Sequence, residues 1–373
     1  MKVLLVSHTY VATPYREKLA ALSAQPDVDL TLIVPEYWQY EMRAVSFSPT
    51  NADRGYSIRP MPVYFNGRNG KFMFPWRSVV RTLKELAPDI LHVEEEPLSL
   101  LAFQFLLLNR WTAKAGTVMF TWENLSFQHD PIRKFVERYT ISHTDYLIAG
   151  NEAAKDLMLQ KGAPEDRVSV FPQIGIHPPA PDDIYPFSAP AEPFTVGFVG
   201  RLIPEKGVFD LLEAFARLPK NAHLLVVGGG NAEEEFVRRA EHLGVLSRIE
   251  LTGSIPHEAV EAHIRSLDTL VLPSRTTPRW AEQFGHVLIE AMVLGIPVVG
   301  SDSGAIPEVI SDAGLVFPEG DVGTLTACLK QLLHALDTRA GIGRRGKARC
   351  LAHYTHDRIA EATCEIYRSI LNN

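Results

Sequence analysis

Short apolar runs alternate with longer amphipathic stretches along the whole chain. This alternation is typical of βα units around parallel sheets, in which a buried strand is followed by a helix. In the first half, the predicted strands are residues 2–6, 29–34, 89–93, 117–121, 146–149 and 168–171, and the predicted helices are 14–24, 77–87, 131–142 and 152–161. In the second half, the predicted strands are 195–199, 222–227, 249–252, 269–272 and 297–299. The pattern predicts an α/β protein with two similar halves.

A proline-rich stretch separates the two halves. Residues 172–193 contain seven prolines, a density that excludes a helix and favours an extended connector. We therefore predict a first domain over 1–175, a linker over 176–193 and a second domain over 194–355. The helical pattern over 356–371 follows the last predicted strand, so this segment could return to brace the first domain.

Composition and charge narrow the class of protein. The 373 residues carry 37 Lys and Arg against 44 Asp and Glu, a net charge of −7 that gives no reason to expect a nucleic acid partner. The apolar stretch 97–108 is shorter than the ~20 residues of a membrane span. Cys328, Cys350 and Cys364 are odd in number and lack metal-ligand spacing, which favours reduced thiols and a cytoplasmic protein rather than a disulfide framework or a zinc site.

Two carboxylates flank a predicted helix start in the second half. Glu282 precedes a helix that is expected to begin near Gly285, and Glu290 follows inside it. The backbone N–H groups of such a start, helped by the helix dipole, favour an anionic ligand, and a glycine lets it approach closely. Taken alone, the two carboxylates could equally lie on the solvated face of a helix.

Two cations lie on a loop after the first strand of this half. Arg201 offers a planar fork and Lys206 a point charge, so the two could converge on a diphosphate. Both could also be ordinary surface residues. Glycine-rich loops follow the next two predicted strands, at 227–231 and 252–256, where they could approach a nucleotide or serve as packing turns.

Together these motifs resemble glycosyltransferase family 4. The resemblance rests on the Glu-x7-Glu pair Glu282 and Glu290 and on the Gly-Arg-Leu-x-x-Glu-Lys-Gly loop at 200–207, and it covers about 194–326. It implies a GT-B fold, which consists of two Rossmann-like, doubly wound parallel-sheet domains facing across a cleft. It also implies retaining transfer of a hexose from a nucleoside-diphosphate sugar, without a metal or other cofactor.

The resemblance also implies roles for single residues. Arg201 and Lys206 would hold the donor diphosphate, Glu290 the ribose, and Glu282 the sugar. The implied donor-binding residues are Gly200, Gly253, Ser254, Ile255, Phe284, Gly285, His286 and Glu290. The implied catalytic residues are Arg201, Lys206, Glu282 and, from the first half, Glu123.

The first half departs from the family pattern. The loop at 8–15 has no glycine where many relatives have a glycine-rich loop, and Glu123 or Asn124 stands where relatives often have a histidine. Glu123 could instead be a helix cap or a rim carboxylate. The glutamates at 94–96 could bind acceptor hydroxyls or cap a helix starting at residue 97. The predicted acceptor-side residues are His8, Tyr10, Glu95 and Asn124.

The sequence predicts no metal site. His8, His129 and His286 lack ligand spacing and are interpreted as polar loop residues. The acidic pair Asp27 and Asp29 lies at the entry of a strand, the wrong end for a ligand site in a parallel sheet.

A basic segment opposes the net charge. Residues 54–84 contain seven cations and no carboxylate, interleaved with the aromatic residues Phe65, Phe72, Phe74 and Trp76. Such a segment could make a peripheral contact with an anionic membrane at the cytoplasmic face. Alternatively, the aromatic rings pack inward and the cations form a solvated helix face.

The resemblance favours transfer from a UDP- or GDP-sugar to a hydroxyl acceptor in glycan, polysaccharide or glycolipid synthesis, with a glycan or lipid-linked partner. Two alternatives remain: a nucleotide-sugar epimerase of the same fold, and a non-catalytic nucleotide-sugar-binding subunit. A dinucleotide-dependent dehydrogenase is excluded, because the loop after the first predicted strand has the sequence Gly-x-Gly-x-x-Gly in neither half.

Overall fold

The computed structural model describes residues 1–40, 44–50, 53–180 and 193–372. The chain divides into two compact units, Met1–Gly175 with His356–Asn373, and Ile176–Thr355. We call them the N-terminal unit and the C-terminal unit. Most of the predicted linker, residues 181–192, lies outside the described residues.

A seven-stranded parallel sheet forms the centre of the N-terminal unit, in the order β5-β2-β1-β6-β7-β8-β9. Its strands are β1 (Lys2–Val6), β2 (Asp29–Pro35), β5 (Ser57–Met61), β6 (Ile90–Val93), β7 (Gly116–Thr121), β8 (Tyr146–Ala149) and β9 (Val168–Val170). The inner strands are nearly continuous apolar runs because helices cover both faces of the sheet. A separate antiparallel pair consists of β3 (Tyr37–Gln39) and β4 (Ala44–Ser46).

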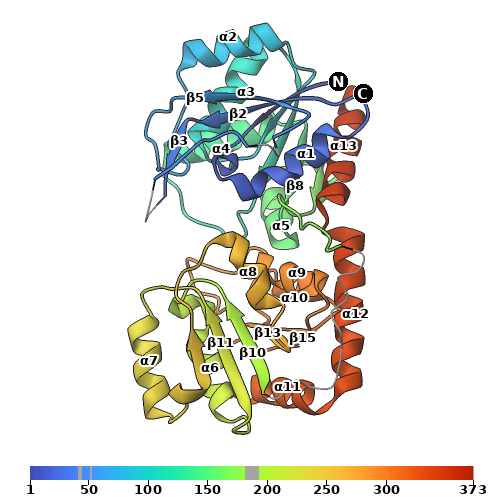
Figure 1. The fold of residues 1–373 in the computed structure, drawn as a ribbon. Coiled ribbons are helices and arrows are strands. Elements are labelled where there is room, and N and C mark those ends of the chain that lie inside the picture. Colours follow the sequence, from blue (N-terminus) through green and yellow to red (C-terminus); the bar gives the residue numbers. More distant parts are fainter. Residues whose placement is uncertain (41–43, 51–52, 181–192, 373) are drawn as a thin grey trace. The chain divides into compact units, whose positions relative to one another are not determined.

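The helices of this unit are α1 (Glu17–Ser23), α2 (Trp76–Leu86), α3 (Leu100–Trp111), α4 (Pro131–Ser142), α5 (Glu152–Gln160) and α13 (His356–Leu371). Connections between parallel strands of one sheet are right-handed as a rule. Through α1 the chain moves from β1 to β2, toward the β5 edge of the sheet, and through α2 to α5 it moves toward the β9 edge. The two sets therefore lie on opposite faces. In agreement, α13 packs beside α1, as Figure 1 shows in red and dark blue, while α3 packs against both α2 and α4.

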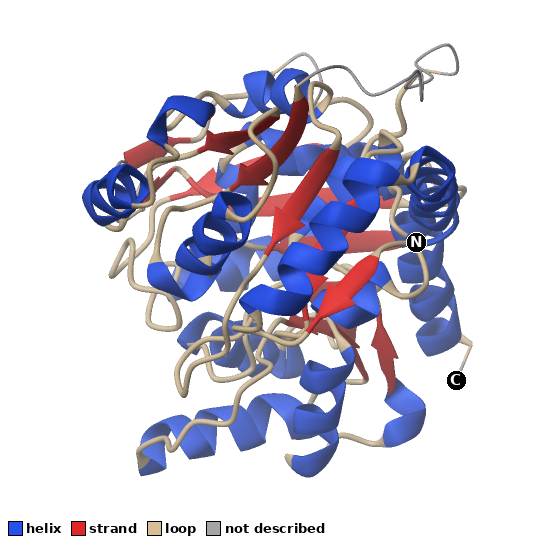
Figure 2. Ribbon diagram, turned by 90° about the horizontal axis from the view of Figure 1, so that it is seen from below, coloured by secondary structure: helices blue, strands red, loops and turns tan. Residues whose placement is uncertain are grey.

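The C-terminal unit has a six-stranded parallel sheet in the order β12-β11-β10-β13-β14-β15. Its strands are β10 (Phe194–Val199), β11 (Ala222–Val227), β12 (Ile249–Leu251), β13 (Thr269–Leu272), β14 (Val298–Ser301) and β15 (Leu315–Phe317). Its helices are α6 (Val208–Ala216), α7 (Glu233–His242), α8 (His257–Ile264), α9 (His286–Val293), α10 (Ile306–Ile310), α11 (Val322–His334) and α12 (Leu336–His353). Figure 2 shows strands in red among helices in blue, and the predicted α/β class with two parallel-sheet domains is confirmed.

Some predicted elements differ from the structure. The expected helix over 14–24 is a 3-10 turn at Thr13–Arg16 followed by α1. The expected helix start at residue 97 is wrong, because α3 begins at Leu100, where the Ser99 side chain accepts a hydrogen bond from the Ala102 N–H. The edge strand β5 escaped the pattern because it contains Arg59 and Pro60 instead of an apolar run, and proline is tolerated at a sheet edge.

Candidate active site

A charged pair lies at the carboxyl end of the second sheet. Lys206 ends the 3-10 turn that follows β10, and Glu282 lies in the loop between β13 and α9. The Lys206 Nζ donates to Oε2 of Glu282 at 2.6 Å, and Ser274 Oγ donates to the same oxygen at 2.8 Å. The side chains of Lys206 and Glu282 are 16% and 9% exposed. The ammonium group is thus held by a carboxylate while it keeps some contact with solvent.

Two glycines allow the loops around this pair to approach closely. Gly207 has φ +67°, and a Cβ there would lie 1.7 Å from the Pro273 carbonyl oxygen. Gly304 has φ +54°, and its Cβ would lie 2.1 Å from the carbonyl oxygen of Glu282. Both positions require glycine, because an L side chain would be strained and would also clash with backbone. The loops after β10, β13 and β14 are therefore locked together around Lys206 and Glu282.

The loop between β13 and α9 carries a further aromatic group. The Lys206 Nζ lies 5.2 Å from the ring centroid of Trp280, within the range of a cation–π interaction. Trp280 and Thr277 form a backbone bridge. The loop is fastened to the neighbouring one by Arg275, whose guanidinium pairs with Asp210 and whose N–H donates to the Glu205 carbonyl oxygen. Sequence reasoning missed Trp280 and Ser274, although both flank the predicted Glu282 motif.

The other two charged residues of the predicted donor site have different surroundings. The Arg201 side chain is exposed and has no hydrogen-bond or ion-pair partner in the part of the chain that the structure describes. Glu290 lies inside α9, where burial raises its pKa above the ordinary value, His257 opposes that rise and Glu261 adds to it. The structure thus joins Lys206 to Glu282 directly and leaves the Arg201 guanidinium open to a ligand.

The predicted glycine loops are bonded to one another. The N–H of Gly200 donates to Val227, and the N–H of Gly228 donates to the carbonyl oxygen of Gly253. Part of this glycine content therefore serves packing between loops. Gly253 itself has open space where a side chain would lie, and Ser254 beside it is exposed.

The helix start at α9 has the geometry that the sequence predicts. Gly285 is the N-cap with φ +80°, and the helix begins at His286. Phe284 is buried, with its ring against His286 and edge-on to Tyr354 at 5.5 Å.

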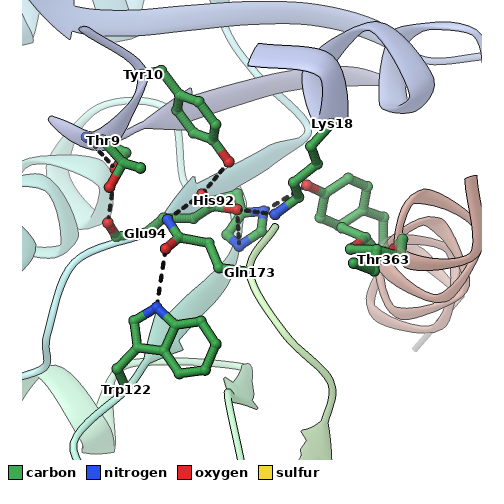
Figure 3. A network of polar contacts seen from close by, with 11 residues as sticks. Thr9, Tyr10, Lys18, His92, Glu94, Trp122, Gln173 and Thr363 are labelled. Atoms are coloured by element: carbon green, nitrogen blue, oxygen red, sulfur yellow. Dashed lines mark hydrogen bonds and ion pairs between the residues drawn. The ribbon is translucent and has the colours of Figure 1, made fainter. Parts of the chain in front are cut away.

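In the N-terminal unit, Glu94 is the centre of a buried polar network (Figure 3). Its carboxylate forms an ion pair with Lys18 and accepts hydrogen bonds from the Tyr10 hydroxyl at 2.5 Å and the Gln173 amide at 2.8 Å. Burial alone would raise the Glu94 pKa, but the Lys18 charge holds it below the ordinary value. Gln173 also accepts a hydrogen bond from the Trp122 indole N–H at 3.1 Å.

The next two glutamates also have partners inside the protein, so none of the three caps α3. Glu95 accepts a bond from the His8 N–H at 3.0 Å and contacts His8 Nδ1 at 2.5 Å. Burial opposes a charge on His8, but Glu95 raises the His8 pKa above its ordinary value. Glu96 accepts bonds from the Thr121 hydroxyl and the Trp122 N–H, and burial raises the Glu96 pKa to about 7.

Glu123 belongs to a second ion cluster. Lys161 Nζ donates to Glu123 Oε2 at 2.7 Å and to Glu137 Oε1 at 2.5 Å. His129 Nε2 lies 3.7 Å from Glu123 Oε1, although the sequence interpretation treated this histidine as isolated. Ligand atoms of Glu123, His129 and Glu137 lie within 4.8 Å of one another, a spacing that suits a metal ion, but the Lys161 ammonium already binds both carboxylates. The half-buried Asn124 follows directly after Glu123.

Comparison with known proteins identifies the family. Residues 12–173 match the family model of a glycosyl transferase 4-like domain, and residues 182–349 match that of glycosyl transferases group 1. The chain belongs to glycosyltransferase family 4. The second match includes Arg201, Lys206, Glu282 and Glu290, so the resemblance that those motifs carried is confirmed.

Solved structures agree with a GT-B fold for this family 4 chain. Anabaena HepE in complex with UDP has a TM-score of 0.72 at 19% identity and is matched over 99% of this chain and 100% of its own. Sucrose-phosphate synthase from Thermosynechococcus elongatus also has a TM-score of 0.72, at 18% identity over 100% and 99% of the two chains. A glycosyltransferase from Rickettsia africae reaches 0.74 at 15% identity, over 100% and 99%.

Among curated proteins, the family 4 chain is similar to the D-inositol 3-phosphate glycosyltransferase of Mycobacterium tuberculosis. The two are 26% identical over 257 residues, which is 64% of this chain and 51% of the relative. The match thus spans about half the length of that relative. Among the described residues, no helix combines the length and apolar character that crossing a bilayer requires.

Proposed function

We propose that this chain is a retaining glycosyltransferase that moves a hexose from a UDP- or GDP-sugar to a hydroxyl acceptor. The observation that carries the proposal is the 2.6 Å contact between Lys206 and Glu282 at the carboxyl ends of the second sheet's strands. Open α/β sheets bind ligands at that end. The acceptor would be a glycan or a lipid-linked precursor in glycan, polysaccharide or glycolipid synthesis.

The cations act on the leaving group. When the bond between the sugar and the diphosphate breaks, negative charge grows on the diphosphate and positive charge on the sugar carbon. Lys206 and Arg201, whose side chain has no partner among the described residues, would stabilise the diphosphate electrostatically, which lowers the barrier without a metal ion. Lys206 is already positioned by Glu282 and Ser274, so little reorganisation is needed when the donor binds.

The ribose, the base and the sugar of the donor would contact other residues of the C-terminal unit. Glu290 would bind the ribose hydroxyls, and the stretch Gly253 to Ile255 would lie beside the base, where Gly253 leaves open space. Glu282 and the backbone at Phe284 and Gly285 would orient the sugar. The UDP in the HepE structure makes UDP-sugars the first donors to test.

The acceptor contacts would come from the N-terminal unit. His8 with Glu95, and Asn124 beside Glu123, offer donors and acceptors for a polyol. Tyr10 is fully buried and donates to Glu94, so we assign it to the support of the His8 loop. A name such as D-inositol 3-phosphate glycosyltransferase suggests a phosphorylated polyol as one acceptor for the screen.

The experiment has two stages. A thermal-shift panel of nucleoside diphosphates and nucleotide-sugars identifies the base, because a ligand that binds only the folded protein raises its melting temperature. The stabilising donor is then incubated with a set of hydroxyl acceptors, with and without EDTA, and the anomeric configuration of the product is read by NMR. We expect a retained anomer and rates that EDTA leaves unchanged.

Other results would overturn the proposal. Isomerised sugar from donor alone indicates the epimerase, and donor binding without transfer or hydrolysis indicates a binding subunit. An inverted anomer contradicts retention, and loss of activity in EDTA that added divalent metal restores contradicts metal independence. Arg265→Ala is a matched control for Lys206→Ala, because Arg265 forms an exposed pair with Glu261 within α8 and its C-cap.

A further inference from the structure

Three adjacent helices carry exposed apolar side chains on one face of the N-terminal unit. The helices α2, α3 and α4 lie on the same side of the first sheet, and α3 contacts both neighbours. Trp76 on α2 is 41% exposed, Trp111 on α3 is 76% exposed, and Ile132 and Phe135 on α4 are 73% and 61% exposed. We call the outer face of these three helices the α2–α4 face.

Side-chain contacts connect the apolar groups across helices. The ring of Phe103 on α3 lies 6.2 Å from that of Phe135 and 4.9 Å from that of Tyr139, both on α4. On α2, a shallow hollow of about 470 Å³ is lined by Trp76 and Val80 together with three cations and Glu85. The ring contacts thus connect α3 with α4, and the hollow lies on α2 beside them. Large exposed apolar side chains that gather on one side of a unit are typical of interaction sites.

The same face is strongly cationic. The three helices carry seven cations against two carboxylates, a net charge of +5 in a chain whose total is −7. The cations are Arg77, Arg81, Lys84, Arg110, Arg133, Lys134 and Arg138. One of the two carboxylates, Glu137, is buried against Lys161, whereas Glu85 faces solvent. Asp130 at the N-cap of α4 is a further exposed carboxylate, and it pairs with Arg133.

We propose that the α2–α4 face docks on the surface of an anionic lipid bilayer. Cations near the lipid phosphates would attract the unit, and Trp111, Ile132 and Phe135 would enter the interface between headgroups and acyl chains. A second copy of the chain fits less well, because two faces of charge +5 repel each other. Nucleic acid fits less well because an aliphatic side chain such as Ile132 gains little from stacking on bases.

The proposed contact surface differs from the basic segment 54–84 that the sequence suggested. In the basic segment 54–84, Phe72 and Phe74 are fully buried, so the alternative of inward packing holds for these two rings, whereas Phe65 and Trp76 are exposed. Phe72 packs edge-on against Trp38 and His8. Of this segment, α2 belongs to the α2–α4 face, while the exposed Phe65, Arg68 and Lys71 lie on the loop before it.

The test measures vesicle binding by the full chain and does not depend on the proposed transferase activity. Co-sedimentation is compared between vesicles of phosphatidylcholine alone and vesicles with added phosphatidylglycerol. We expect binding to the anionic vesicles only, and less binding as salt is raised. The triple variant Arg77→Gln, Arg81→Gln, Lys84→Gln should lose affinity on the order of 100-fold. Each cation near the leaflet contributes roughly fivefold to the affinity, and three such factors multiply to about that value.

Two further variants make the result specific. Ile132→Ser with Phe135→Ser should weaken vesicle binding while the positive charge stays. The matched control removes three cations from the C-terminal unit, Arg238→Gln, Arg239→Gln and Arg265→Gln, and should bind vesicles as the unchanged chain does. Circular dichroism verifies that each variant is folded.

Three results would overturn the proposal. The first is no binding of the unchanged chain to anionic vesicles, and the second is equal loss in the control variant. The third is evidence that the α2–α4 face binds another partner and no vesicles. Sedimentation velocity would show this as a dimer that Phe135→Ser dissociates, and a gel shift would show it as binding to RNA.

Discussion

The ammonium nitrogen of Lys206 lies 2.6 Å from Oε2 of Glu282, although the two residues are 76 positions apart in the chain. The carboxylate holds the cation in place and also shares its charge. A diphosphate that reaches Lys206 would therefore join an existing ion pair instead of meeting a free side chain.

Lys206→Ala should lower kcat/KM for transfer by about 30- to 1000-fold, which corresponds to ~2–4 kcal/mol for a charge-assisted contact in the transition state. Steady-state kinetics with the stabilising donor would measure this. Lys206→Arg keeps the charge but not the geometry and should recover part of the activity. If Lys206→Ala has the kinetics of Arg265→Ala, Lys206 is not in the site.

Trp280→Ala should raise KM for the nucleotide-sugar more than it raises the Kd of the free nucleoside diphosphate. The indole ring lies beside Lys206 and offers an apolar face to a sugar, while the cation–π contact itself contributes only about 0.5–1 kcal/mol. Trp280→Phe retains a ring and should behave more like the unchanged protein. Equal changes in KM and Kd would instead place Trp280 at the diphosphate.

The family resemblance implies a catalytic role for Glu123, so Glu123→Gln should lower kcat, by about 100-fold where that role is a proton transfer. Glu137→Gln is the matched control, because Glu137 shares Lys161 with Glu123 but has no assigned catalytic role. The two variants are compared in kcat and in thermal stability. An equal effect of both on kcat would assign Glu123 to the ion cluster alone.

Lys18→Met should destabilise the protein by about 3–5 kcal/mol, because it leaves the buried Glu94 carboxylate without its counter-ion. The midpoint of urea unfolding would report the loss. Adding Glu94→Gln to this variant should restore part of it, since the unpaired charge is then removed. Lys71→Met, at an exposed position, should leave the midpoint unchanged.

Glu96 should make stability depend on pH between about 4.5 and 7, because burial raises its pKa from 4.5 to about 7. The folded protein binds this proton more tightly in the window, so the contribution of Glu96 to the free energy of unfolding decreases as pH rises, by at most about 1.4 kcal/mol per pH unit. The buried His92, whose pKa burial lowers to about 4, contributes with the opposite sign between about 4 and 6.5, so the Glu96 contribution is read as the difference between two proteins. The pKa of Glu94 is lowered, so its contribution is lost only below this window. The difference in unfolding free energy between the unchanged protein and Glu96→Gln should fall as pH rises through the window, and a difference that does not depend on pH would contradict the assignment.

The sequence by itself determined the parallel α/β class and the residues of the donor motif. Apolar runs of strand length followed by amphipathic stretches are local patterns, and a local pattern is enough to tell which segments become buried strands and which become covering helices. The Glu-x7-Glu motif and the loop at 200–207 are local too, so Lys206, Glu282 and Gly285 could be selected before any contact was known.

Only the tertiary structure decided which of these residues meet. The order of strands in each sheet brings the loops after β10, β13 and β14 together, and no periodicity within one segment encodes that order. For this reason the sequence missed Trp280 beside Lys206, the pairing of Lys18 with Glu94 and the approach of His129 to Glu123. Burial of an aromatic ring is decided in the same way, because alternation shows which side of its own element a residue occupies but not whether another element covers that side.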